Sequence, residues 1–387
     1  MIALDLISAA ILAAMLAVAL YNLRTAPRLE RAGEPISLPS VSILVPARDE
    51  EENLRRTLPL LLAQSYPRLE VLVLDDRSAD GTADVARSIA FPTARLRVMR
   101  GTEPPSGWVG KNWACHQLAA AATGDVLVFC DADVDAAPSA VRRSVAALQA
   151  ELADALTALP GQRLDGWVQA AVVPVVAQLP VLAMLPIRLV PRVRSPSLSM
   201  ANGQWLAFTR AAYEACGGHA GVRGEVLEDV ALGRRVKVAG GRLVVCVAPS
   251  LLTVRMYGTA ASLREGFRKN LYPLLGGRRL PFTLLLALLT IAWLYPALGA
   301  LRGSAGALVP LALLAALRVA GMILFGHGWR TAMLHPVGVA IAIALGVESW
   351  LAHERGRVRW KGRLAGLGTG AAGTETRPIG ADGRAGG

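Results

Sequence analysis

The sequence is poor in several residue types that define common classes of protein. Only four of its 387 residues are cysteines, and no two of them form a C-x-x-C pair. A zinc site or a dithiol redox motif is therefore not expected, and the cysteines are interpreted as free thiols. Charged residues make up 18% and aromatic residues 5% of the chain, whereas hydrophobic residues make up 53%. This composition predicts membrane segments.

The positive charge of the chain is not distributed as in a nucleic-acid-binding protein. The formal net charge is +12, but no basic stripe is interleaved with aromatic residues and no nucleic-acid-binding module is found. Basic residues instead gather beside apolar segments, which indicates a membrane and not a nucleic acid as the partner. These residues are Arg24, Arg28, Arg31, Arg264, Arg268, Lys269, Arg278 and Arg279.

Apolar segments at both ends of the chain predict a multi-pass protein of the cell (inner) membrane. Residues 2–23 are long enough to span a bilayer, which takes roughly 20 residues. No basic stretch precedes them and no clear cleavage site follows, which favours a retained anchor, residues 1–24, over a cleaved signal peptide. The arginines after this anchor place the central region, residues 40–275, in the cytoplasm by the positive-inside rule.

Three further apolar segments, 280–301, 305–326 and 333–352, make residues 280–353 a second membrane region. Arg318 lies inside the middle segment, at a cost of about 2.5–3.5 kcal/mol on insertion scales. Three crossings here would leave the basic residues 355–363 outside, against the positive-inside rule, so incomplete crossing by one segment stays open. The tail, residues 362–387, is rich in Gly, Ala and Thr and is expected to be disordered.

In the central region, strand-like segments alternate with helical patterns. This alternation predicts an α/β fold with a mainly parallel sheet, helices on both faces, and ligands beyond the carboxyl ends of the strands. The expected strands are 41–45, 70–76, 95–99 and 125–133. Residues 166–190 form a long apolar segment, which we expect to be interfacial or re-entrant and anchored by Arg188, Arg192 and Arg194. A buried core helix is the alternative.

Acidic residues follow two of the expected strands. Asp75 and Asp76 end the second strand, where a carboxylate can accept hydrogen bonds from a ribose or a base. Asp131 and Asp133 follow the fourth strand, and alternation along an extended segment would put both on one side. Two carboxylates there make a site for Mg²⁺ or Mn²⁺, which would neutralise a departing diphosphate. Polar turns are the alternative at both places.

An EF-hand is the main competitor for the second acidic cluster. Counted from Asp131, an EF-hand needs glycine at position six and glutamate at position twelve. The chain has Ala136 and Arg142 at these positions, so an EF-hand is excluded.

The stretch "SGWVGKNWACHQLA", residues 106–119, matches a phosphate-binding loop only in part. A Walker A motif has a glycine five residues before the Gly-Lys pair and a hydroxyl residue after it, but this chain has Pro105 and Asn112. What remains is Lys111 at the start of a helix, which favours an anion, or else a solvated lysine. Trp108 and Trp113 are candidate walls of a pocket, or they pack the helix against the sheet or the membrane face.

A third acidic pair, Glu228 and Asp229, lies in the helical pattern "GEVLEDVALGRRV". By itself this pair is explained by a solvated helix face with arginine partners. The order of the motifs along the chain, however, favours a functional role for this pair. The motifs "VPARDEEENL", "LDDRSADGT", "GWVGKNWA", "DADVD", "NGQWLAFTRAAYEACGGH" and "LEDVALGRRVKVAG" together resemble those of membrane-anchored family 2 glycosyltransferases. The branch with ceramide-glucosyltransferase-like, hopanoid-associated and carotenoid-acid glycosyltransferases is the most similar.

The resemblance implies a GT-A type nucleotide-diphospho-sugar transferase fold with a mixed sheet. It also implies a divalent metal and inverting transfer from a nucleotide-diphosphate sugar, here to a membrane lipid. Asp229 would be the general base that takes the proton of the acceptor, and Asp133 would be the more direct metal ligand of the D-x-D. The residues implied to bind the nucleotide sugar are Asp75, Asp76, Lys111, Asp131 and Arg268. Further candidates for the pocket are Pro46, Glu50, Glu228, Gln204 and Trp205.

One motif departs from the family pattern. Many relatives carry Q-x-x-R-W ahead of the membrane spans, where this chain has "REGFRKN". Glu265 stands at the glutamine position, Lys269 at the tryptophan position, and Arg268 at the arginine position, where it could still hold a diphosphate. The missing tryptophan argues against processive polymer synthesis. Transfer to polyprenyl phosphate or a polysaccharide, and a non-catalytic membrane protein of the same fold, are the alternatives.

Overall fold

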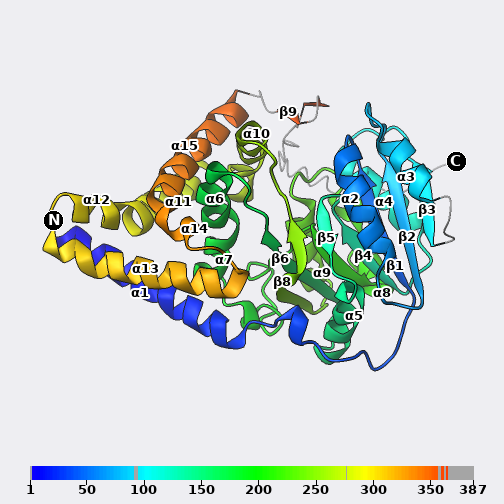
Figure 1. Ribbon diagram of the computed structural model, residues 1–387, viewed down its shortest axis with the longest axis horizontal. Helices are drawn as coiled ribbons and strands as arrows, with labels where there is room; N and C mark the ends of the chain where they lie inside the picture. The colour runs from blue at the N-terminus through cyan, green and yellow to red at the C-terminus, as the bar shows by residue number, and fades with distance from the viewer. Residues whose placement is uncertain (1, 91–94, 276, 356–358, 361–362, 365–387) are drawn as a thin grey trace, which may run out of the picture.

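A computed structural model of the chain describes residues 2–90, 95–275, 277–355, 359–360 and 363–364. A sheet with its covering helices lies at one end of the molecule, and a bundle of apolar helices lies at the other (Figure 1). The tail that was expected to be disordered, residues 362–387, lies outside the described residues except for 363–364.

Eight of the described strands form one mixed sheet in the order β3-β2-β1-β4-β7-β6-β8-β5. The strands β1, β2, β3 and β4 run parallel, and β7 runs antiparallel to both β4 and β6. The predicted α/β fold with a mixed sheet is confirmed. The strands are β1 Val41–Ala47, β2 Leu69–Asp75, β3 Leu96–Arg100, β4 Val126–Cys130, β5 Val134–Ala136, β6 Ala155–Gln162, β7 Trp205–Thr209 and β8 Leu243–Val254, with a separate pair β9 Arg359–Trp360 and β10 Arg363–Leu364.

The sheet is buried on both faces because its strands are runs of apolar residues with few polar interruptions. Successive side chains of a strand point to opposite faces. Along β2, Leu72 belongs to one buried cluster, while Val71 and Val73 belong to the other. The cluster that holds Leu72 continues into Leu12 and Met15 of the first apolar helix, so one face of the sheet shares its core with the helical bundle.

Helices of the sheet region and short helical turns cover these faces. They are η1 Leu29–Arg31, α2 Glu51–Leu62, α3 Thr82–Ala90, α4 Gly110–Ala121, α5 Ala140–Ala150, η3 Ile187–Leu189, α8 Arg210–Ala215, η4 His219–Val222 and α9 Glu228–Val238. Two further elements, α10 Ala260–Asn270 and η5 Pro273–Leu275, follow the last strand of the sheet, and α10 packs against the apolar helices instead.

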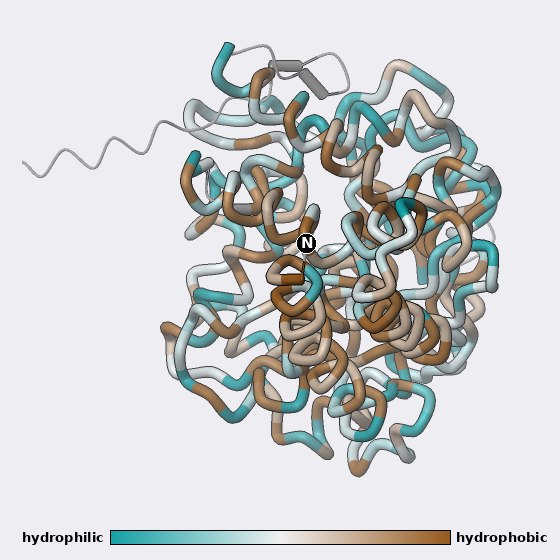
Figure 2. Tube along the Cα trace, turned by 90° about the vertical axis from the view of Figure 1, so that its left-hand side faces the viewer, coloured by the Kyte–Doolittle hydropathy of each residue, from teal (hydrophilic) through white to brown (hydrophobic). Residues whose placement is uncertain are grey.

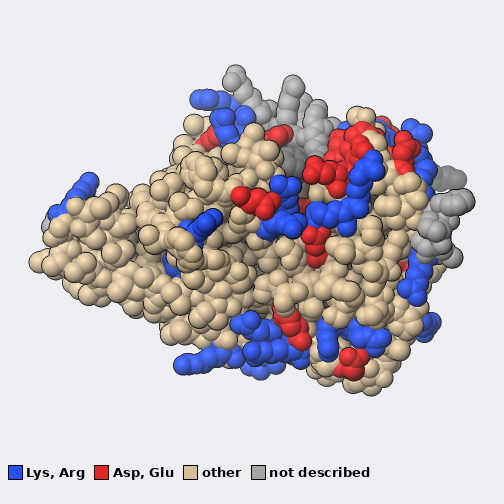
Figure 3. All heavy atoms as spheres, in the orientation of Figure 1, with Lys and Arg blue, Asp and Glu red and all other residues tan. Residues whose placement is uncertain are grey.

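The bundle contains five helices that are long and apolar enough to cross a membrane: Ile2–Thr25, Trp167–Met184, Arg279–Leu301, Ala305–Phe325 and His335–Glu354. Their surface is mostly hydrophobic and carries few charges (Figures 2 and 3). Their segments are α1 Ile2–Thr25, α6 Trp167–Val173, η2 Pro174–Gln178, α7 Leu179–Met184, α11 Arg279–Leu289, η6 Thr290–Leu294, α12 Tyr295–Leu301, η7 Ala305–Ala307, α13 Leu308–Phe325 and α15 His335–Glu354. The short helix α14 Arg330–Met333 lies between the last two of the five helices.

The helix Trp167–Met184 is the most enclosed of the five. Of its apolar window, 61% is buried, against 22–44% for the other four. This helix is also long and apolar enough to cross a membrane, so the interfacial position expected for residues 166–190 stays a prediction. The end of α1 binds the backbone in the last turn of this helix and just after it. The Asn22 side chain donates to the carbonyls of Leu182 and Leu185 at 2.9 and 2.8 Å and accepts from the Ile187 N–H at 2.9 Å.

Candidate active site

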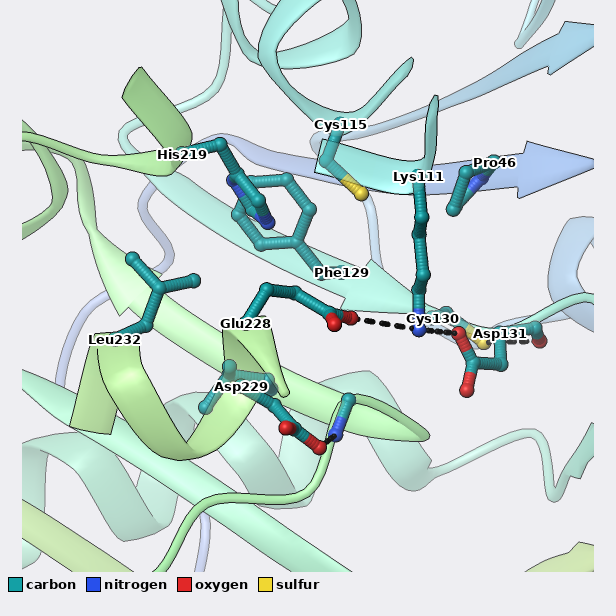
Figure 4. A pocket seen from close by; sticks show the side chains of 12 residues that line it. Pro46, Lys111, Cys115, Phe129, Cys130, Asp131, His219, Glu228, Asp229 and Leu232 are labelled. Carbon is teal, nitrogen blue, oxygen red and sulfur yellow. Dashed lines mark hydrogen bonds and ion pairs between the residues drawn. The ribbon is translucent and has the colours of Figure 1, made fainter. Parts of the chain in front are cut away.

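Lys111 lies at the centre of a small pocket beyond the carboxyl ends of β1 and β4. Its ammonium nitrogen is 2.9 Å from Oδ1 of Asp131 and 2.9 Å from Oε1 of Glu228 (Figure 4). The predicted helix start is confirmed, because Lys111 is the second residue of α4. Asp131 follows β4, and Glu228 is the first residue of α9. The pocket is lined by Pro46, Lys111, Cys115, Phe129, Cys130, Asp131, Gly203, Leu206, His219, Glu228, Asp229 and Leu232.

The Asp229 carboxylate is fixed by two backbone groups. Its Oδ2 accepts a hydrogen bond from the Gly203 N–H at 2.8 Å, and its Oδ1 accepts from the Val230 N–H at 2.8 Å. Burial, and next the neighbouring Glu228 charge, raise the pKa of Asp229 to about 6. A carboxylate with such a pKa is ionised at neutral pH and holds a proton better than an ordinary aspartate does, which suits a general base.

Glu228 and Lys111 stabilise each other's charge. Burial alone would raise the pKa of Glu228, but Lys111 outweighs this and keeps that pKa below its usual value. Burial alone would lower the pKa of Lys111, but Asp131 and Glu228 raise that pKa well above its usual value. The pocket therefore holds a charged lysine between two acids, and an incoming anion could attract this lysine.

The D-x-D residues lie in a turn, not on the extended segment that was expected. The backbone closes there, since the Val134 N–H donates to the Asp131 carbonyl at 3.3 Å. Alternation of side chains therefore does not explain how the two carboxylates meet. They still interact: burial, and then the Asp131 charge, raise the pKa of Asp133 to about 7.

The two D-x-D carboxylates fit a divalent cation. Oδ1 of Asp133 is buried and has no hydrogen-bond partner. Nothing compensates a buried carboxylate oxygen that has no hydrogen-bond partner and lies near a second carboxylate, so a cation would be bound favourably there. Within the described ranges, no group of three or more His, Cys, Asp or Glu side chains could hold a metal. One or two carboxylates together with substrate phosphates are, however, a usual set for Mg²⁺.

Asp75 and Asp76 lie at the end of the neighbouring strand and do not line the pocket. Both are 6% exposed. Asp75 accepts from the Ser78 N–H at 3.1 Å, and Asp76 lies 3.6 Å from the Arg48 guanidinium. Glu50 is also outside the pocket, at the start of α2, where it accepts from the Asn53 side chain.

Several other residues that were expected in the pocket instead pack against or form hydrogen bonds with other parts of the fold. The rings of Trp108 and Trp113 pack edge to face at 5.0 Å and both contact His116. Trp205 is wholly buried and donates to the Ser144 hydroxyl at 2.9 Å, so its assignment to the pocket was wrong. The carbonyl of Gln204 accepts from the Asp131 N–H at 3.4 Å, which makes Gln204 a support of the D-x-D turn.

Arg268 points toward the apolar helices. Its guanidinium is 3.8 Å from Glu348 of α15, and its carbonyl accepts from the Ser349 hydroxyl. The next residue, Lys269, is within electrostatic range of the pocket. Burial lowers the pKa of Lys269, and the Glu228 charge opposes that shift.

Gly203 and His219 are among the pocket residues that the sequence did not indicate. The Gly203 N–H orients Asp229, and its only sequence signal is the "NGQ" that precedes β7. His219 lines the pocket beside Glu228, and its Nδ1 lies 2.8 Å from the Tyr213 hydroxyl. Burial lowers the pKa of His219 to about 3, so the ring is neutral. The "GGH" of the sequence is the signal that could have indicated it.

Comparison with known proteins gives one family and a shared fold. A family model described as "Glycosyltransferase like family 2" matches residues 39–271, well over half of the chain. A mannosyltransferase from Pyrobaculum calidifontis, solved in complex with GDP-Man and Mn²⁺, has a TM-score of 0.51 and 20% identity over 90% of this chain and 98% of its own. At this identity the likeness concerns the fold.

Two curated relatives carry the same name, 4,4'-diaponeurosporenoate glycosyltransferase. The protein of Staphylococcus haemolyticus is 36% identical over 118 residues, which is 30% of this chain and 30% of the relative. The protein of Staphylococcus aureus is 25% identical over 339 residues, which is 84% of this chain and 88% of the relative. The stronger similarity thus covers less than a third of either protein, whereas the weaker one extends over most of both.

Proposed function

The chain belongs to glycosyltransferase family 2, and we propose that it moves a sugar from a nucleotide-diphosphate sugar to a membrane lipid. The observation that carries this proposal is the pocket itself, in which Lys111, Asp131 and the Glu228-Asp229 pair converge beyond the ends of the strands. Open α/β sheets bind their ligands at this edge. The mannosyltransferase of the same fold, solved with GDP-Man and Mn²⁺, supports the same class of donor.

Asp229 is the proposed general base. It accepts the proton of the acceptor as the acceptor oxygen attacks the anomeric carbon, and its two backbone hydrogen bonds fix its orientation. One such attack inverts the anomeric centre. Glu228 is engaged by Lys111 at 2.9 Å, which leaves it poorly suited to a second role as nucleophile.

The nucleotide-sugar donor would be held by the D-x-D carboxylates together with residues of neighbouring elements. Asp75 and Asp76 would contact its nucleoside, and Lys111 would turn from its acidic partners to the diphosphate. Asp131 and Asp133 would hold Mg²⁺ or Mn²⁺, which supplies positive charge for the departing diphosphate. Arg268 would join the diphosphate only by leaving Glu348.

A lipid acceptor is favoured by the continuity between the sheet and the apolar helices. One buried cluster extends from Leu72 of the sheet to Leu12 of α1, so the catalytic region sits directly on the bundle. The names of the curated relatives point to acceptors of a lipid-like kind.

The test is transfer by the purified full chain. The protein is incubated with labelled nucleotide sugars, Mn²⁺ and either a lipid extract or a polyprenyl phosphate, and the products are separated by extraction. A labelled glycolipid that forms only with metal supports the proposal. If polyprenyl phosphate were the only acceptor to become labelled, the acceptor would be a polyprenyl phosphate and not a membrane lipid of the extract. Absence of nucleotide binding in the presence of Mn²⁺ would refute the enzymatic role.

The rate should depend on pH through Asp229. Because the pKa of Asp229 is raised to about 6, the base is ionised above that pH and protonated below it. We expect the rate to be level above about pH 7 and to fall about tenfold per unit well below pH 6. Steady-state rates are measured at saturating donor and at two Mn²⁺ concentrations. If the pH at which the rate begins to fall changed with the Mn²⁺ concentration, the titrating groups would be the D-x-D carboxylates. That result would contradict the assignment to Asp229.

We further propose that the C-terminal apolar region does not cross the membrane at α15. At one end of the bundle, Gly306 lies against Asp5, so the loop before α13 adjoins the start of α1. At the other end, Glu354 is 2.5 Å from Arg279, so the end of α15 adjoins the start of α11. His335 begins α15 beside Trp293, about midway along the helix Arg279–Leu301, with ring centroids 6.1 Å apart.

This arrangement resolves the conflict with the positive-inside rule. Helix α15 would start at mid-depth and return to the side of the catalytic region, which leaves three crossings and the basic residues after it in the cytoplasm. The proposed regions are an anchor at 1–24, a cytoplasmic catalytic region at 40–275 and membrane helices at 280–353.

Cysteine labelling tests this topology. All four native cysteines are buried, so single added thiols report on their own positions. In intact cells a membrane-impermeant maleimide should label Arg302→Cys, in the loop before α13, and should leave Arg355→Cys unlabelled until the cells are permeabilised. Labelling of Arg355→Cys in intact cells would mean that α15 crosses.

A further inference from the structure

Arg318 is a buried cation inside the apolar helices, and no acid among the described residues forms an ion pair with it. It lies in α13 and is 3% exposed. One Nη donates to the Thr331 carbonyl at 3.0 Å, while Nε is buried and has no hydrogen-bond partner. A guanidinium carries five N–H donors, so a single backbone carbonyl leaves most of its binding capacity unused.

Two histidines accompany this arginine. His327 and His335 both interact electrostatically with Arg318. His335 is 2% exposed and packs beside Trp293, and both ring nitrogens of His327 are buried without a hydrogen-bond partner. A neutral imidazole has one N–H donor, so the three side chains together offer donors and a positive charge.

The acids of the apolar helices cannot balance this charge. The apolar segments 2–25, 166–190 and 279–355 contain only three acidic residues, and each binds a group elsewhere. Gly306, against which Asp5 lies, is about 18 Å from Arg318 along the helix Ala305–Phe325 at 1.5 Å per residue. The three acids and their partners are Asp5 with Tyr295 at 2.6 Å, Glu348 with Arg264 at 2.8 Å and Glu354 with Arg279 at 2.5 Å.

We propose that Arg318, together with His327 and His335, binds the anionic group of an amphiphile from the lipid phase, a carboxylate or a phosphate on an apolar chain. A buried charge is costly unless it is paired, and a guanidinium pairs with both anions through two parallel hydrogen bonds. The Thr331 carbonyl that contacts Arg318 belongs to the short helix α14, and both Met333 of this helix and Trp329 just before it are exposed, by 73% and 64%. An amphiphile can therefore approach over an apolar surface. This site uses no residue of the catalytic pocket.

The test measures binding to the full-length protein in nanodiscs of phosphatidylcholine at pH 7.5. The probes are radiolabelled oleate and dioleoyl phosphatidic acid, with oleyl alcohol as the uncharged control. The wild-type protein should bind at least one acid saturably and show a higher Tm with it, and should not respond to the alcohol. Arg318→Met should weaken that binding at least about tenfold, the loss expected for a charge-assisted contact.

A matched variant is Arg302→Met, which removes an exposed arginine from the loop before α13 and should bind as the wild type does. Without ligand, Arg318→Met should have a Tm no lower than that of the wild type, because an apolar residue replaces an uncompensated buried charge. Binding of oleate alone assigns the site to a carboxylate, and binding of phosphatidic acid alone assigns it to a phosphate. Failure of both acids to bind, or unchanged binding by Arg318→Met, overturns the proposal.

Discussion

Replacing Asp229 with asparagine should lower the rate of sugar transfer by about 10³-fold, within the range that a general base contributes. Asparagine keeps the size of the side chain and can still accept a hydrogen bond from the Gly203 N–H, but it cannot take the proton of the acceptor. The loss should therefore appear in kcat, with little change in the binding of the nucleotide and metal. Transfer is measured under saturating donor, and binding is measured by calorimetry.

Glu225→Gln is the matched control for this change, since Glu225 is an exposed acid of the loop just before α9. Its rate should stay within about twofold of the wild-type rate, as is usual for surface positions. If Asp229→Asn kept the wild-type rate, the base would have to be another group. If it lost nucleotide binding as well, the residue would be structural.

Replacing Asp133 with asparagine should abolish most of the metal-dependent rate, by about 10³-fold, because metal assistance is worth several kcal/mol to a departing diphosphate. The buried Oδ1 of Asp133 has no hydrogen-bond partner in the part of the chain that the structure describes, so its loss removes a proposed metal ligand and not a structural contact. Mn²⁺ binding in the presence of the nucleotide, followed by electron paramagnetic resonance, should weaken in parallel.

The control lies two residues further along the chain. Asp135 pairs with Arg56 and Arg163 at the edge of the sheet, away from the pocket lining. Asp135→Asn should lower stability slightly and leave Mn²⁺ binding as it is. Equal losses in both variants would mean that the D-x-D segment acts through its fold and not through a bound cation.

The sequence predicted the strands and the acidic motifs at their ends because both depend on local pattern. Runs such as "VLVFC" form buried strands wherever the sheet places them, and a polar residue directly after such a run must lie at its carboxyl end. The start of α4 at Gly110 was likewise visible in the sequence, since Lys111 opens an unbroken helical pattern.

Contacts between distant segments could not be predicted in this way. Nothing local shows that Lys111 pairs with Glu228 or that Gly203 holds Asp229, because both contacts depend on how α9 packs against the sheet. Trp205 was misassigned for a related reason. It begins a strand, and whether its ring enters the core or the pocket depends on the register of β7 with β4.

The contacts of Asn22 give the first apolar helix a second role. Its amide closes hydrogen bonds with three backbone groups, one in the last turn of the enclosed helix Trp167–Met184 and two just after it. Removal of α1 would leave these groups unsatisfied in an apolar setting and would open the core that Leu12 and Met15 share with the sheet. The helix α1 is therefore a folded part of the unit that contains the sheet, and not a tether that can be cut without loss of that fold.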